Sequence, residues 1–225
     1  MTPITKWAGP LCLIAAALVI SSELLRLAIG LTSGPDMATT VAHTLSYGLA
    51  LVAMFALLLA LTALYLRGQR ALGTLGLVAY LTAALGIVLV AGDWWFEAFA
   101  VPTIGAAAPQ VLALPPGGSL LVGAMITAGL FAAGWIMFGV AAIRGGAFST
   151  PACVLLMVGG VCGVFALSTP YQLPLAVAVG WIGYTLIRSR PQAPVGHTGG
   201  PVSTIVRGLT SSSGMTRSSR VSDPR

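Results

Sequence analysis

Long apolar runs separated by short polar turns dominate the sequence. About 20 consecutive apolar residues suffice for a helix to cross the hydrocarbon core of a bilayer. The runs predict transmembrane helices at residues 8–29, 39–66, 71–91, 119–143, 150–167 and 171–187. We therefore expect an all-α, polytopic integral membrane protein in which residues 1–188 form a bundle of six transmembrane helices.

The polar residues between the runs support these boundaries. Thr39 or Thr40 can cap the second helix, and Arg67-Gly68-Gln69-Arg70 is expected to form a tight basic turn. The glycines after Arg144 are expected to end the fourth helix.

Two segments are not predicted to span the membrane. Residues 101–118 are rich in proline, and we expect them to lie at the membrane interface or to pack on the bundle, because irregular backbone is not tolerated against lipid. From residue 189 to residue 225 the chain changes to Ser, Thr, Gly, Pro and Arg. Such a composition predicts a disordered tail.

The composition agrees with a lipid environment. Of the 225 residues, 57% are hydrophobic and 7% are charged, whereas a soluble domain has about 25% charged residues. The net charge of +6 comes from basic residues placed singly at the ends of apolar runs. This pattern is typical of topology determinants and not of a phosphate-binding stripe, so the expected partner is the lipid bilayer and not a nucleic acid.

The distribution of basic residues predicts the orientation. With six spans, both termini share one side with the turns at Arg67 and Arg144, and Arg26 is the one basic residue on the other side. The positive-inside rule then makes both termini cytoplasmic. Because nearly all basic residues are arginine and Ala and Gly abound, we infer a GC-rich bacterial genome and hence a plasma membrane.

The acidic residues gather at the opposite, extracytoplasmic side. Asp93 and Glu97 are four residues apart and share one face of a helix. Glu23 lies below the outer boundary, so it should face protein and pair with Arg26, with Asp93 or Glu97 as competitors. The candidate ligand-binding residues are Glu23, Arg26, His43, Asp93 and Glu97.

Three aromatic residues accompany these acids. Trp94, Trp95 and Phe96 directly follow Asp93. Aromatic side chains at the end of a span are typical of the belt at the membrane–water interface, and we expect these three to form one.

No catalytic residue is predicted. His43 is the one histidine outside the tail, which argues against a bis-histidine haem, and no G-x-S-x-G, Walker or CxxC pattern is present. The three cysteines lie inside apolar runs, and we expect them to be small, buried apolar side chains. We expect no cofactor. A mixed carboxylate–histidine metal site at His43, Glu23, Asp93 and Glu97 stays open, although catalytic zinc usually has more nitrogen or sulfur ligands.

Three functions remain, in order of preference. The first is a non-enzymatic membrane component, meaning an accessory, assembly or scaffold subunit with a membrane-protein partner or a second copy of itself. The alternative is a transporter or channel for a small cation, a proton or a polar solute, and the third is an intramembrane metal-dependent enzyme. No charged residue lies in the middle of a predicted span, which weighs against translocation.

Overall fold

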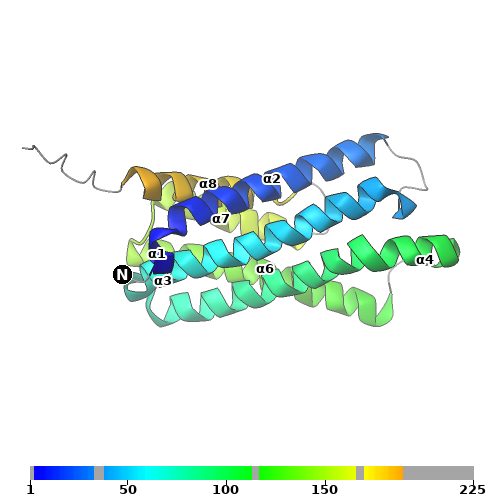
Figure 1. The fold of residues 1–225 in the computed structure, drawn as a ribbon. Helices are drawn as coiled ribbons and strands as arrows, with labels where there is room; N and C mark the ends of the chain where they lie inside the picture. Colours follow the sequence, from blue (N-terminus) through cyan, green and yellow to red (C-terminus); the bar gives the residue numbers. More distant parts are fainter. Residues whose placement is uncertain (1–2, 33–37, 113–116, 166–169, 190–225) are drawn as a thin grey trace, which may run out of the picture. The chain divides into compact units, whose positions relative to one another are not determined.

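The computed structural model describes residues 3–32, 38–112, 117–165 and 170–189. Within these ranges the chain forms helices and turns and contains no strand, so the all-α class is confirmed. The helices run side by side, as Figure 1 shows.

Contacts divide the chain into two units, Met1–Arg190 and Pro191–Arg225. Everything described below belongs to the first unit. The disorder predicted for the tail falls, from residue 190 onward, outside the described residues.

The first long helix, α2 (Ala8–Thr32), follows a short helix α1 (Pro3–Lys6) and confirms the first predicted run. It packs antiparallel to α8 (Leu173–Arg188). A Cβ atom added to Gly183 would lie 2.7 Å from the Cys12 side chain. Small residues at this crossing therefore let the two backbones approach closely.

The longest helix, α3 (Val41–Trp95), is a helical hairpin. Thr40 caps its start by accepting a hydrogen bond from the backbone N–H of His43 at 3.2 Å. The chain reverses at Gly73, whose φ of 60° and ψ of −155° suit only glycine. We call residues 41–72 the first arm and residues 74–95 the second arm.

Contacts between the two arms show that they are antiparallel. The rings of Tyr65 and Tyr80 stack with centroids 4.6 Å apart, and the Thr62 hydroxyl lies 3.3 Å from the Tyr80 hydroxyl. The turn predicted at residues 67–70 is wrong, because these residues stay helical and the reversal occurs at Gly73. Polar side chains near a helix end can reach water without breaking the helix.

The second arm continues beyond the predicted span. A π-helical turn, η2 (Phe96–Ala100), leads into α4 (Val101–Ala107), and α5 (Pro109–Leu112) follows. At about 1.5 Å per residue, the helix from residue 74 to the end of α4 reaches roughly 50 Å, longer than a hydrocarbon core of about 30 Å. Much of the segment predicted to be interfacial is therefore helical.

The remaining helices complete the bundle. Helix α6 (Gly118–Gly145) ends at Gly146, which has φ of 61°, and confirms the fourth predicted run. It is followed by α7 (Thr150–Cys162), a 3-10 turn η3 (Gly163–Phe165) and α8. Successive contacts close a ring in the order α2, α3, α6, α7, α8 and back to α2.

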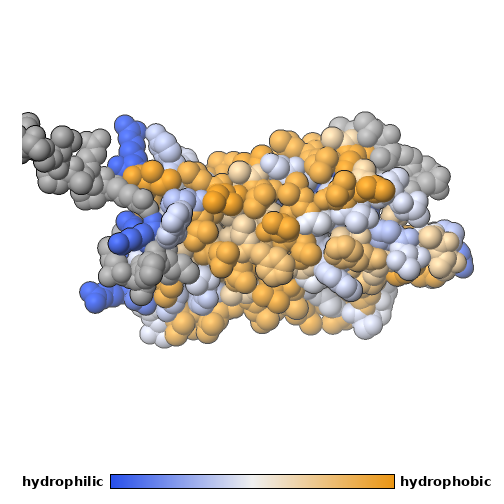
Figure 2. All heavy atoms as spheres, viewed as in Figure 1, coloured by the Kyte–Doolittle hydropathy of each residue, from blue (hydrophilic) through white to orange (hydrophobic). Residues whose placement is uncertain are grey.

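Within the described ranges, three helices are long and apolar enough to cross a membrane: the one that comprises α2, the one that runs from α3 through α4, and α6. Helices α7 and α8 are apolar but have only 13 and 16 residues, so six complete spans are not confirmed. Figure 2 shows hydrophobic residues over the middle of the visible face and hydrophilic ones concentrated at one end. This surface fits a membrane protein.

The short helix α7 ends beside the middle of α6. A Cβ atom on Gly163, just after α7, would lie 2.7 Å from the Phe131 ring, and Phe131 is roughly 20 Å from the start of α6. None of the residues 119–127 of α6 is buried, whereas the buried positions of this helix begin at Ala128.

Candidate functional site

The described charged side chains lie at two opposite ends of the bundle. We call one the basic end; it holds Lys6, Arg67, Arg70, Arg144 and Arg188. We call the other the polar end; it holds the five candidate residues Glu23, Arg26, His43, Asp93 and Glu97. No charged side chain among the described residues lies between them.

Glu23 and Arg26 form a buried ion pair on α2. The Arg26 Nη2 atom donates to the Glu23 Oε1 atom, one turn away on the same helix face. Glu23 is fully buried and Arg26 is 6% exposed. The predicted pairing is thus present, and neither Asp93 nor Glu97 displaces Glu23 from the guanidinium.

Arg26 also joins α2 to both arms of α3 through two aromatic rings. Its guanidinium carbon lies 5.4 Å from the centroid of Tyr47 on the first arm and 4.8 Å from that of Trp94 on the second arm. A desolvated cation–π contact contributes about 2 kcal/mol. Trp94 therefore does not face lipid as predicted, because it is 1% exposed and lies under this cation, while Trp95 and Phe96 remain exposed.

His43 connects the beginning of the first arm to the end of the second. Its Nε2 atom lies 3.0 Å from the carbonyl oxygen of Glu97 and 3.5 Å from the Glu97 carboxylate. Because a carbonyl only accepts, the Nε2–H group donates. The His43 ring also contacts Tyr47, with centroids 4.6 Å apart.

Pro102 explains why this carbonyl is available. In a π-helical turn each carbonyl pairs with the N–H group five residues later, as Phe96 does with Val101. The corresponding partner of Glu97 is Pro102, which has no N–H group. The sequence thus leaves the Glu97 carbonyl open, and His43 satisfies it.

Several buried polar atoms of this cluster have no hydrogen-bond partner among the described residues. The atoms are Glu23 Oε2, Arg26 Nε and Nη1, His43 Nδ1 and Trp94 Nε1. A buried polar atom without a partner costs about 1–3 kcal/mol. The cluster therefore has unused capacity to bind small polar groups.

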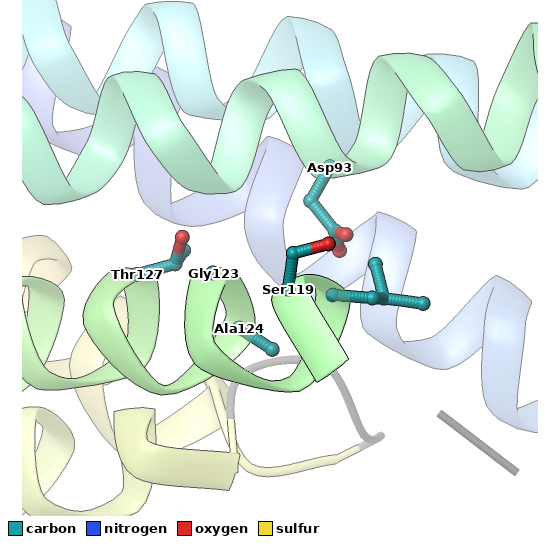
Figure 3. A pocket seen from close by; sticks show the side chains of 6 residues that line it. Asp93, Ser119, Gly123, Ala124 and Thr127 are labelled. Carbon is teal, nitrogen blue, oxygen red and sulfur yellow. The ribbon is translucent and has the colours of Figure 1, made fainter. Parts of the chain in front are cut away.

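Asp93 is directed away from this cluster. It lines a cavity of about 310 Å³ between the second arm and α6, together with Ser119, Leu120, Gly123, Ala124 and Thr127. Figure 3 shows the Asp93 carboxylate and the Ser119 hydroxyl pointing toward one another at one end of this cavity. Arg26 acts on Asp93 only through longer-range electrostatic attraction. The structure therefore brings together four of the five candidate residues and separates the fifth.

A metal site is not supported by the geometry. Among the described residues, no three His, Cys, Asp or Glu side chains converge in an arrangement that could hold a metal ion. The hydroxyl of Ser46, one turn after His43, donates to the His43 carbonyl at 2.8 Å.

Sequence reasoning missed Tyr47, Ser119 and Thr127 in this region, and it assigned Trp94 to the aromatic belt. Tyr47 and Trp94 hold the Arg26 cation, and their spacing from His43 and Asp93 was visible, but the contact partner on another helix was not. Ser119 and Thr127 line the Asp93 cavity, and their only signal was an eight-residue spacing on one helix face.

Comparison of the chain with protein-family models, with curated proteins and with solved structures finds no match. The function is therefore argued from the residues alone.

Proposed function

We propose that the chain is a non-enzymatic, multi-pass component of a bacterial plasma membrane, an accessory, assembly or scaffold subunit. The observation that carries the proposal is how the charges at the polar end are used. Glu23 pairs with Arg26, and Arg26 joins α2 to both arms of α3. His43 joins the start of the first arm to the Glu97 carbonyl beyond the second arm. Such contacts fix the packing of the helices and do not form a pathway for an ion or solute.

The core of the bundle between the polar end and the basic end supports the same conclusion. Its largest fully buried side chains are apolar or aromatic, including Met54, Phe131, Trp135 and Phe138. A translocation path for ions normally requires polar or ionisable groups at the membrane midplane. The transporter alternative is favoured by one observation, the partnerless buried atoms of Glu23, Arg26 and His43.

We further propose that the basic end is cytoplasmic and the polar end extracytoplasmic. The basic residues at the turns support this orientation through the positive-inside rule. Helices α7 and α8 run in opposite directions, so α8 ends at the basic end whatever depth the two helices reach. A reporter active only in the cytoplasm, fused after Arg225, should be active. A fusion active only outside would contradict the proposed orientation.

The choice between scaffold and transporter is tested by ion flux. The protein reconstituted in liposomes with an internal pH dye should show the same proton flux as empty liposomes under an imposed potassium diffusion potential. Glu23→Gln should leave the flux unchanged but lower the amount of folded protein, because it removes the charge that pairs with buried Arg26.

The matched control is Arg70→Gln, at an exposed position of the basic end, which should change neither quantity. The opposite pattern would establish the transporter: a wild-type flux above background that Glu23→Gln or Asp93→Asn abolishes while the variants remain folded.

A further inference from the structure

The structure points to a lipid-binding site at the Asp93 cavity. We propose that this cavity binds the ammonium headgroup of a phospholipid such as phosphatidylethanolamine, with the carboxylate of Asp93 as the counter-ion. The inference rests on the proposed function, because it places the polar end in the extracytoplasmic leaflet.

The outer part of α6 is exposed. Residues 119–127 of this helix are not buried, although they belong to an apolar helix that is densely packed from Ala128 onward. The cavity of about 310 Å³ separates this part from the second arm. None of the described residues fills this space, and we infer that in a membrane it is open to lipid.

The lining of the cavity combines a carboxylate with a hydroxyl group. Asp93 supplies the one charged group, and the Ser119 hydroxyl points toward it (Figure 3). Among the described residues, Asp93 forms no ion pair within 4.0 Å. A primary ammonium has three N–H donors and a positive charge, and it matches a carboxylate next to a hydroxyl oxygen.

The lining residues follow one another along α6 in the order expected for a bound lipid. Ser119 lies near the start of the helix, and Gly123, Ala124 and Thr127 follow toward the interior of the bundle. The charged group therefore lies at the outer end of the cavity and the small residues lie deeper. A lipid of the extracytoplasmic leaflet has the same order, with its headgroup outward and its chains inward.

The outer part of α6 also offers apolar surface for the acyl chains. Leu120, Leu121, Met125 and Ile126 are each about half exposed or more. A second cavity, of about 340 Å³ between the two arms of α3, is lined by apolar and aromatic residues such as Met54, Ile87 and Trp95 and has no charged group. That cavity can accept acyl chains but has nothing that selects a headgroup.

The test measures lipid binding by the purified full-length protein in detergent, from the rise in Tm with added lipid. Phosphatidylethanolamine should raise the Tm by several degrees and more than phosphatidylglycerol, because only the former carries an ammonium. Asp93→Asn should weaken the binding of phosphatidylethanolamine at least about tenfold, since a charge-assisted hydrogen bond is lost.

Two further variants make the result specific. Gly123→Leu should also abolish the shift by filling the cavity, and it should fold, because a Cβ atom at Gly123 would meet nothing within 4 Å. Glu97→Gln removes a carboxylate of the polar end that does not line the cavity, and it should keep the shift.

Equal shifts with the two lipids, or an undiminished shift in Asp93→Asn, would overturn the proposal. An equal shift with soluble phosphoethanolamine would overturn the lipid as the source of the ammonium. Flux in liposomes is measured separately, so failure of the lipid site and failure of the proposed function are distinguishable.

Discussion

Replacing Arg26 by leucine should destabilise the protein by about 3–5 kcal/mol, because Glu23 would be left buried without its counter-ion. Loss of the contacts with Tyr47 and Trp94 adds to this cost. The expected drop in Tm, measured on the purified protein in detergent, is roughly 10 °C for a chain of this size.

A double replacement separates the contribution of the ion pair to stability from that of side-chain packing. Glu23→Leu combined with Arg26→Leu should recover most of the lost stability, since apolar residues often replace a buried ion pair without net loss. Arg70→Leu, the same change at an exposed position, should leave the Tm nearly unchanged. If Arg26→Leu were as stable as the wild type, the buried pair would not hold the polar end together.

Replacing Gly134 by alanine should destabilise the contact between α6 and the second arm of α3 by about 1–3 kcal/mol. The added Cβ atom would lie 2.3 Å from both the Cα and the backbone nitrogen of Ala83. Backbone atoms cannot move aside as a flexible side chain does, so the two helices must separate. The measurement is the Tm in detergent together with the yield of folded protein.

Gly129→Ala on the same helix is the matched control. A Cβ atom at Gly129 would meet nothing within 4 Å. The helix should then gain about 0.5–1 kcal/mol from the lower flexibility of alanine in the unfolded chain. A Gly134→Ala variant that matched Gly129→Ala in stability would show that the close approach at Ala83 is unimportant.

The long apolar runs were sufficient to predict the helical class and three helices almost to their ends. The run at residues 8–29 became α2, the run at 119–143 became α6 and the run at 171–187 became α8, because length and hydropathy together define an apolar helix. The Thr40 cap was also predictable, since its side-chain oxygen suits the start of a helix.

The reversal of α3 was not predictable from polarity. Arg67-Gly68-Gln69-Arg70 contains the polar residues of a turn, yet the position that requires a glycine conformation is Gly73, within an apolar stretch. Many glycines in this chain lie at helix crossings, so a glycine alone did not mark the turn.

The separation of Asp93 from Glu97 could not be predicted either. Their four-residue spacing correctly placed the two acids on adjacent helical turns. The second arm, however, packs against the first arm on one side and against α6 on the other, and the spacing does not say which neighbour each acid faces. Asp93 therefore lines the cavity next to α6, while Glu97 contacts His43. The burial of Trp94 was not predictable for the same reason. Whether an aromatic side chain contacts lipid depends on which helices pack against its own helix, and the local sequence does not show this.

The single-residue reversal at Gly73 links the lengths of the two arms. Adding one residue to the second arm would turn everything beyond it by about 100°. Trp94 would leave the Arg26 cation, and Asp93 would leave its cavity. An insertion or deletion in either arm is therefore tolerated only when a compensating change restores the rotational phase.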